Sequence, residues 1–296
     1  MTVAATSECP ATTLEDDTAL PTLNKQSVAG LTALAYLAVC ALLLSPAQAE
    51  SGLPEGFVYL RDVEPSIAQD IRYAEANNFA GHPAPGYKAP ECVLAGEAAR
   101  ALKRVQKALK PQGLSLKVYD CYRPARAVRS FVTWARSPAN EGSDKKSYYP
   151  NLTKPELLKQ EYIASPSGHS LGTAVDLTLI RTPVSGSDEG KSSSAGSGTC
   201  TAPQKKRAPD NSVDMGTGFD CFDELSHTAN PQITPKQRHW RQTLLQAMKA
   251  AGFANYPLEW WHFSMSIEGY DKHLDFPVEP RLDGDDRAPG DSGDGN

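Results

Sequence analysis

The sequence predicts one α+β domain with a mostly antiparallel central sheet flanked by helices. Three observations support this class. Helical and strand-like segments alternate from Gly52 to about Pro280, no internal repeat is visible, and the apolar and charged fractions of 40% and 22% are ordinary for a globular protein. The length of 296 residues suits one large domain with end segments of different composition.

The first predicted helix carries apolar residues at helical spacing and ends at Pro111-Gln-Gly113. Its apolar face consists of Leu94, Ala98, Leu102, Val105 and Leu109. The next segment, Leu114 to Tyr119, alternates and predicts a strand. A second helix is expected to open at Arg123-Pro124 and to run to about Arg136, because proline is tolerated in a first helical turn.

Two strands and a third helix are predicted further along the chain. Thr173 to Ile180 and Leu258 to Met265 are rich in β-forming residues and predict strands. Thr234-Pro235 predicts a helix start, since threonine is a good N-cap and proline suits the first helical position. We expect that helix to stop at Gly252.

The N-terminus is typical of an export signal. Ala29 to Leu44 is almost wholly apolar, and the small residues Ser45-Pro-Ala-Gln-Ala49 follow, as signal peptidase requires. The apolar run is short of the roughly 20 residues that span a bilayer. We therefore expect residues 1–49 to be a cleaved signal peptide, and the mature protein to be periplasmic or secreted without stable membrane association. The acidic Glu15-Asp-Asp17 and the single basic Lys25 leave a misplaced start codon or a retained anchor as alternatives.

Four cysteines remain after signal removal, an even number in an oxidising compartment, so disulfides are expected with three possible connectivities. We expect Cys92 to pair with Cys121 and Cys200 with Cys221. A metal site built on cysteines is disfavoured, because no Cys-x-x-Cys pair is present.

Two segments are predicted not to fold. Residues 183–211, rich in Ser, Gly and Lys, predict a disordered surface insertion, and residues 281–296 predict a disordered acidic tail. The folded domain is then 50–280. The net charge of −5 and the lack of a dense Lys/Arg cluster argue against nucleic acid as a partner. The sequence does not determine the oligomeric state.

Two short motifs about ninety residues apart carry the predicted chemistry. Ser167-Gly-His-Ser-Leu-Gly-Thr-Ala-Val-Asp176 and Glu259-Trp-Trp-His262 together contain two histidines, one aspartate and one glutamate. Three such ligands with an open fourth position are typical of a catalytic zinc site, and a nearby carboxylate can act as its base. Either motif alone is a weak signal. A Ser-His-Asp triad is the competing interpretation, but no Gly-x-Ser-x-Gly elbow accompanies it.

The backbone between the candidate ligands must bend. His169 and Asp176 are seven residues apart, which puts them on opposite faces of any continuous strand. Glycine tolerates sharp backbone turns, so we expect the bend at Gly172.

The pattern Ser-x-His-x(6)-Asp with Glu-x-x-His resembles the zinc D,D-peptidases, and the resemblance runs from about Phe57 to Pro277. It implies the zinc D,D-peptidase, or hedgehog-type, fold. Further motifs narrow the resemblance to the D-alanyl-D-alanine dipeptidases, which include the vancomycin-resistance dipeptidases. These motifs are Tyr73-Ala-Glu-Ala-Asn-Asn-Phe-Ala-Gly81, Gly86-Tyr87, Asp120-Cys-Tyr-Arg-Pro124, Ser147-Tyr-Tyr-Pro150 and Met215-Gly-Thr-Gly-Phe-Asp220 followed by Ser226-His227.

The resemblance implies one Zn²⁺ per chain and a role for each motif residue. The implied ligands are His169, Asp176 and His262. Glu259 is implied as the general base and then the acid. Arg123 is implied to support the scissile carbonyl oxygen as it gains charge, with a simple ion pair to Asp120 as the alternative.

Further residues are implied to surround the substrate. Asp220 matches the carboxylate that holds the substrate's free ammonium, and Ser167, Tyr73 and Tyr87 match residues around the termini of the dipeptide. His227 lies in a family motif, and we treat it as structural. The remaining histidines outside the motifs are expected at the surface or in loops; these are His82, His239 and His273.

The implied function is zinc-dependent hydrolysis of D-alanyl-D-alanine to two D-alanines in cell-wall dipeptide turnover. One alternative is a peptidoglycan D,D-carboxypeptidase or endopeptidase, which Asp220 argues against because it implies capture of a free ammonium. Another is a non-catalytic zinc-containing cell-wall-binding protein, which intact Glu259 and Arg123 argue against. The chain departs from the family at Cys121, where glycine is usual, and a disulfide there would tether the loop that carries Arg123.

Overall fold

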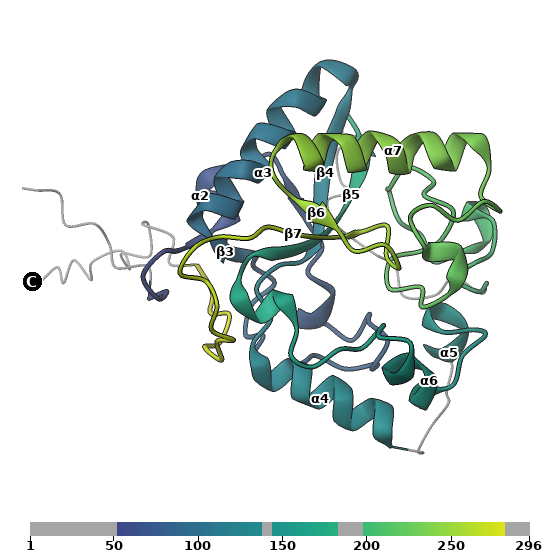
Figure 1. Cartoon of the computed structure of the whole chain (residues 1–296), viewed down its shortest axis with the longest axis horizontal. Helices are drawn as coiled ribbons and strands as arrows, with labels where there is room; N and C mark the ends of the chain where they lie inside the picture. Colours follow the sequence, from purple (N-terminus) through teal and green to yellow (C-terminus); the bar gives the residue numbers. More distant parts are fainter. Residues whose placement is uncertain (1–51, 138–143, 183–197, 282–296) are drawn as a thin grey trace, which may run out of the picture. The chain divides into compact units, whose positions relative to one another are not determined.

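The computed structural model describes residues 52–137, 144–182 and 198–281 (Figure 1). The predicted signal peptide 1–49 lies outside the described residues, as do residues 183–197 and all of the predicted tail except Arg281. Within the described ranges, no helix combines the length and the apolar character that a membrane crossing needs.

A five-stranded sheet forms the centre of the domain, in the order β2-β4-β5-β7-β6. Its strands are β2 (Ala68–Gln69), β4 (Leu114–Asp120), β5 (Ala174–Arg181), β7 (His262–Ser264) and β6 (Ala254–Asn255). The pairs β4-β5, β5-β7 and β6-β7 are antiparallel, whereas β2 runs parallel to β4. A separate antiparallel pair consists of β1 (Phe57–Tyr59) and β3 (Val93–Ala95). The predicted mixture of helices and sheet is confirmed. The prediction of a mostly antiparallel central sheet is matched in part, because three of its four pairings are antiparallel and the β2-β4 pairing is parallel.

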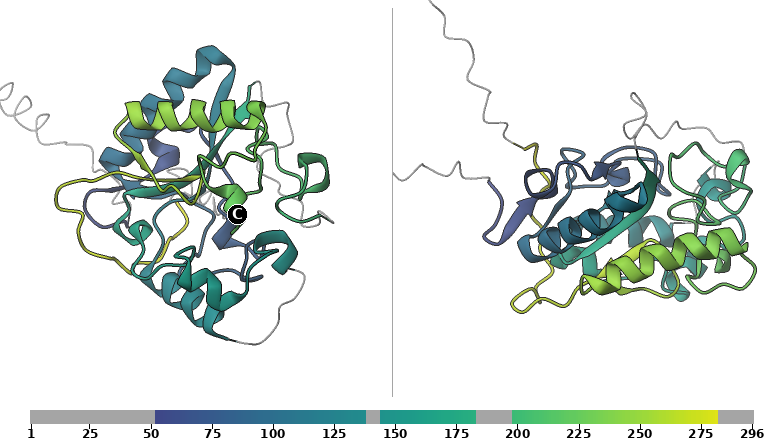
Figure 2. Two further views of the ribbon diagram at one scale, coloured as in Figure 1. Left: turned by 45° about the vertical axis from the view of Figure 1, so that its right-hand side comes forward. Right: turned by 90° about the horizontal axis from the view of Figure 1, so that it is seen from above.

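Two groups of helices accompany the sheet. The helices are α2 (Leu60–Val63), α3 (Gly96–Leu109), α4 (Ala125–Arg136), α5 (Asp144–Tyr148), α6 (Lys154–Lys159) and α7 (Pro235–Ala250). α3 and α7 pack against each other and against the central strands, while α4 contacts α6 away from that pair (Figures 1 and 2). Strand β4 is therefore buried at every position instead of alternating, because elements cover both of its faces.

The predicted helices are present, with small shifts at their starts. α3 begins at Gly96 because Leu94 belongs to strand β3. Pro124 directly precedes α4 in an extended conformation instead of lying in its first turn. α7 begins as predicted, because the Thr234 side chain accepts a hydrogen bond from the backbone N–H of Gln237 in a capping box.

The second predicted motif strand is shorter than expected. β7 begins only at His262, since a turn with a hydrogen bond from Glu259 N to Tyr256 O occupies the preceding residues. This turn places Glu259 and His262 near each other at the start of the strand.

Both expected disulfides are present. Cys92 is bonded to Cys121, and Cys200 is bonded to Cys221. The first connects the residue before β3 with the residue after β4, and the second connects the C-terminal part of the predicted insertion with the loop that contains Asp220.

The prediction of a disordered insertion was wrong for residues 198–211. Asp210 lies 2.7 Å from the buried Lys117 ammonium and 3.0 Å from the Arg72 guanidinium, and it accepts a hydrogen bond from the Tyr119 hydroxyl. Charge compensation by these partners and the bond from Cys200 hold the segment on the domain despite its polar composition.

Candidate active site and metal centre

The three predicted ligands meet at the junction of β5 and β7. Asp176 and His262 are directly opposed in the β5-β7 pairing, and His169 comes from the short 3₁₀ turn Gly168–Leu171. The Nε2 atom of His169 lies 3.1 Å from Nδ1 of His262 and 3.3 Å from a carboxylate oxygen of Asp176. Nδ1 of His262 lies 3.0 Å from the other oxygen of Asp176. These three side chains form the one group among the described residues that could hold a metal ion.

The expected bend at Gly172 is confirmed. Gly172 has a φ of +74° and ends the turn that carries His169 before β5 begins. A side chain at this position would overlap the ring of Phe57, so both the backbone conformation and the packing require glycine. Ser167 caps the same turn, and its hydroxyl accepts a hydrogen bond from the backbone N–H of His169 at 3.3 Å.

The tautomer of His169 is set by a backbone carbonyl. Its Nδ1 lies 2.7 Å from the carbonyl oxygen of Cys121, which can only accept, so Nδ1 carries the proton. The Nε2 lone pair is then free to face Asp176 and His262, as a histidine that binds a metal requires. Two imidazoles and a carboxylate that converge in this way fit a divalent metal ion.

Charge is concentrated at the centre of this group. Burial alone would raise the pKa of Asp176, but His169 and His262 beside it hold that pKa well below its usual value. Asp176 is therefore ionised at neutral pH, which is the state in which it can bind a cation.

Glu259 lies next to the candidate ligands without belonging to them. One of its carboxylate oxygens is 3.9 Å from Nδ1 of His262. Its side chain is buried, and burial, followed by the charges of Asp176 and Asp220, raises its pKa well above the usual value. The carboxyl group can therefore hold a proton at a pH where an exposed glutamate would not.

Arg123 lies three residues after the end of β4, and its side chain reaches toward the same centre. Its Nε and Nη2 atoms each lie 2.9 Å from one oxygen of Asp120, and Nη2 is 3.5 Å from Asp176. The guanidinium stands over the ring of Tyr73 at 4.8 Å. The ion pair with Asp120 and a position beside the candidate metal ligands, which we treated as alternatives, thus occur together.

Asp120 is the site residue that our sequence interpretation missed. It is completely buried, and its oxygen that pairs with Arg123 is also 3.3 Å from Nδ1 of His169. Its other oxygen accepts a hydrogen bond from the Tyr87 hydroxyl at 2.6 Å. The available signal was its position three residues before Arg123 in the same motif, where we considered it only as a charge partner.

Asp220 is brought to the site by the loop after Met215. Its side chain is buried, and it accepts a hydrogen bond from the Tyr73 hydroxyl at 2.8 Å. Burial, followed by the negative charge of Asp176, raises the pKa of Asp220 to about 7. The surroundings of this carboxylate therefore leave its charge largely uncompensated.

The other histidines lie as expected. His227 makes a hydrogen bond to the Tyr162 hydroxyl through Nε2 at 2.9 Å. His82, His239 and His273 are exposed.

Comparison with known proteins gives one consistent result. The model of the Peptidase M15 family, described as D-ala-D-ala dipeptidase, matches residues 54–199 and 191–279. A D-alanyl-D-alanine dipeptidase of Enterococcus faecium is 36% identical over 225 residues, which cover 76% of this chain and 98% of that protein. A D-alanyl-D-alanine dipeptidase of Streptomyces coelicolor is 33% identical over 75% of this chain and 98% of its own length. One of Escherichia coli K12 is 29% identical over 70% of this chain and 83% of its own length.

Proposed function

This chain belongs to the Peptidase M15 family of D-ala-D-ala dipeptidases, and on that premise we propose that it is a zinc-dependent enzyme that hydrolyses D-alanyl-D-alanine to two D-alanines. The observation that carries the proposal is the convergence of the three candidate ligands with Glu259 beside them. A purely structural zinc site would close its fourth position with a protein ligand and would need no adjacent acid.

We assign the metal position to His169, Asp176 and His262. Nitrogen and carboxylate oxygen donors of this kind suit zinc, and the tautomer of His169 leaves a lone pair for it. The chemistry that Zn²⁺ supplies when bound is polarisation of the peptide carbonyl and activation of a water molecule.

Glu259 transfers the proton. The carboxylate takes a proton from the attacking water as its oxygen bonds to the carbonyl carbon, and it gives that proton to the departing amine as the carbon–nitrogen bond breaks. Burial raises the pKa of Glu259. This favours the stage between the two proton transfers, in which the Glu259 carboxyl group holds the proton.

Arg123 stabilises the oxyanion. The carbonyl oxygen gains negative charge during the attack, and a fixed guanidinium is well suited to stabilise it. Asp120 beside it, against the opposing effect of burial, raises the pKa of Arg123 well above the usual value, so the side chain remains charged.

Asp220, which accepts a hydrogen bond from the Tyr73 hydroxyl, accounts for selection of a free dipeptide. The substrate carries a charge at each end, and both charges must leave water when the dipeptide enters a buried site. Asp220 compensates the ammonium, so a blocked or extended amino terminus loses this partner. We assign Ser167 to the surroundings of the other terminus. Tyr87 is reassigned from substrate contact to orientation of Asp120, because its hydroxyl donates a hydrogen bond to that carboxylate.

We further propose that the enzyme acts outside the cytoplasm, in turnover of cell-wall dipeptide. Two disulfides support an oxidising compartment. An exported enzyme would not meet cytoplasmic cell-wall precursors, which favours turnover over a part in vancomycin resistance.

The proposal is tested with the purified mature chain, D-alanyl-D-alanine and its N-acetylated form, with zinc content measured on the same samples. We expect cleavage of the free dipeptide only. Cleavage of the acetylated compound would indicate a D,D-carboxypeptidase, and bound zinc without any cleavage would indicate a binding protein.

A further inference from the structure

Asp220 has an unusual backbone conformation. Its φ is +54°, in the left-handed region that residues with a side chain rarely adopt. Such a conformation is energetically unfavourable for a residue with a side chain and persists where the surroundings impose it. The loop from Met215 to His227, which contains Asp220 and is called here the Asp220 loop, must therefore be held by specific contacts.

The two ends of the Asp220 loop are joined by Arg241 of α7. The Arg241 guanidinium is buried, and its Nε donates to the carbonyl of Met215 at 2.7 Å. Nη1 donates to the carbonyl of His227 at 2.6 Å and Nη2 to that of Leu225 at 2.8 Å. All three partners are backbone carbonyls rather than carboxylates. The hydrogen bonds of the Arg241 guanidinium thus connect parts of the loop to one another and to α7; none of them goes to a carboxylate.

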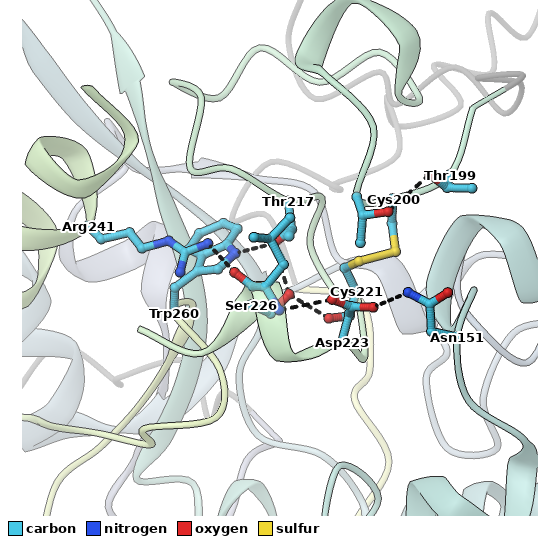
Figure 3. The surroundings of a disulfide bond; sticks show 11 residues. Asn151, Thr199, Cys200, Thr217, Cys221, Asp223, Ser226, Arg241 and Trp260 are labelled. Atoms are coloured by element: carbon cyan, nitrogen blue, oxygen red, sulfur yellow. Dashed lines mark hydrogen bonds between the residues drawn. A yellow bond between two sulfur atoms is a disulfide. The ribbon is translucent and has the colours of Figure 1, made fainter. Parts of the chain in front are cut away.

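The middle of the loop is held by a disulfide and a chain of hydrogen bonds (Figure 3). Cys221, next to Asp220, is bonded to Cys200, and its carbonyl accepts from the Ser226 hydroxyl at 2.6 Å. That hydroxyl is 2.9 Å from the Thr217 hydroxyl, which accepts from Nε1 of Trp260 at 2.8 Å. Trp260 directly follows Glu259, so the chain of contacts runs from the turn that carries the proposed base to the residue after Asp220.

We infer that Arg241 is a positioning residue for substrate binding: with the Cys200–Cys221 disulfide it holds the Asp220 loop in the one conformation that presents Asp220 to the ammonium of the dipeptide. This inference rests on the proposed function. It also explains two motif residues. The Ser226 hydroxyl donates a hydrogen bond to the carbonyl of Cys221 within the loop, and the carbonyl of His227 accepts one from Arg241.

Arginine is required for this task by its geometry. Three carbonyls at different points of the loop need three donors in a rigid plane, and lysine offers only one compact ammonium. Burial lowers the pKa of Arg241 to about 10, so the group is still charged at neutral pH and keeps its donors. A buried cation whose hydrogen bonds go to neutral carbonyls is costly, which argues against a role as a simple filler of the core.

The test compares Arg241→Lys and Arg241→Met with the wild-type enzyme. We expect KM for D-alanyl-D-alanine to rise about tenfold or more, because three charge-assisted hydrogen bonds are lost, while kcat changes by less than about threefold. The preference for the free dipeptide over its N-acetylated form should fall, because a displaced Asp220 no longer binds the free ammonium. Zinc content should remain at the wild-type level. Hydrogen–deuterium exchange should quicken in residues 215–227 and not in β5.

The matched control is Arg181→Met. Arg181 is an exposed arginine that stands over the ring of Trp240, the residue before Arg241, at 5.1 Å. This variant removes a guanidinium close to the same helix, and its KM should equal that of the wild type. If the Arg241 variants do not fold, Ser226→Ala and the paired Cys200→Ala, Cys221→Ala variant loosen the same loop and should raise KM in the same way.

Two outcomes would overturn the inference. The first is a folded Arg241→Lys enzyme with unchanged KM and unchanged exchange in the loop. The second is a loss of kcat and zinc as large as the rise in KM, which would show a general structural role. A wild-type chain that cleaves no dipeptide would instead overturn the proposed function, and the role in substrate binding with it.

Discussion

The carboxylate of Asp120 accepts a hydrogen bond from Nε of Arg123 at 2.9 Å. The same oxygen lies 3.3 Å from Nδ1 of His169. A single buried carboxylate thus pairs with the proposed oxyanion-stabilising group and lies beside a candidate metal ligand, and the Tyr87 hydroxyl donates a hydrogen bond to its second oxygen. Because the Nδ1 proton of His169 is donated to the carbonyl of Cys121 at 2.7 Å, Asp120 acts on this ring through its charge, whereas it binds Arg123 directly.

The first prediction concerns this shared carboxylate. Asp120→Asn keeps the shape of the side chain and removes its charge, so Arg123 and His169 lose a common partner. We expect zinc affinity to fall about 10- to 100-fold, with a parallel fall in kcat. Competition with a chelator measures the affinity. Asp275→Asn, which disturbs an exposed pair with Arg126 and Arg129, is the control and should change neither quantity.

The second prediction concerns the proposed base. Glu259→Gln preserves the size of the side chain but cannot accept the proton of water, and we expect kcat to fall about 10²- to 10⁴-fold. Zinc content should stay at the wild-type value, because Glu259 is not a ligand. Glu268→Gln, an exposed glutamate nearby in the sequence, should keep full activity. Loss of zinc from the Glu259 variant would contradict the separation of base from ligands.

The third prediction concerns pH and Asp220. Its pKa is raised from 3.8 to about 7, so the folded protein binds this proton more tightly than the unfolded chain does. The contribution of this bound proton to the stability of the folded protein is fully present below about pH 4 and is lost as the pH rises through about 7. Asp220→Asn should therefore stabilise the zinc-free protein at pH 8, by about 2–4 kcal/mol, and not at pH 4. Urea unfolding at the two pH values measures this.

Substrate binding should show the opposite preference. Only ionised Asp220 compensates the ammonium, so KM for D-alanyl-D-alanine should rise as the pH falls below about 7. The effect should be absent in Asp220→Asn, whose KM is high at every pH. A wild-type KM independent of pH between 6 and 8 would count against Asp220 as the ammonium partner.

The fourth prediction separates the two disulfides. Replacing Cys92 and Cys121 by alanine should destabilise the protein by about 2–4 kcal/mol, and the same should hold for Cys200 and Cys221, since the loops they close are similar in length. Only the first pair should weaken zinc binding, because the carbonyl of Cys121 holds His169. Denaturant unfolding and chelator competition on both double variants provide the comparison. Equal zinc affinity in the two would refute this assignment.

Much of the fold could be predicted because its signals are local. The capping box at Thr234, the apolar spacing of α3 and the bend at Gly172 depend on neighbouring residues, and all three are present. The parallel pairing of β2 was not predictable, since a two-residue strand has no periodicity of its own. The order in 198–211 was missed for a related reason. Composition there indicated disorder, whereas the outcome depends on distant cations that meet Asp210.

The sequence by itself determined which residue types are available for catalysis and the local turns that carry them, because motif spacing and backbone preferences act over a few residues. Only the tertiary structure decided which of those groups contact one another. It placed Asp120 between Arg123 and His169, turned Tyr87 toward Asp120, and brought Arg241 to the Asp220 loop. A buried charge takes its partners from whichever segments pack around it, and apart from Arg123, which follows Asp120 by three residues, these partners come from distant parts of the chain.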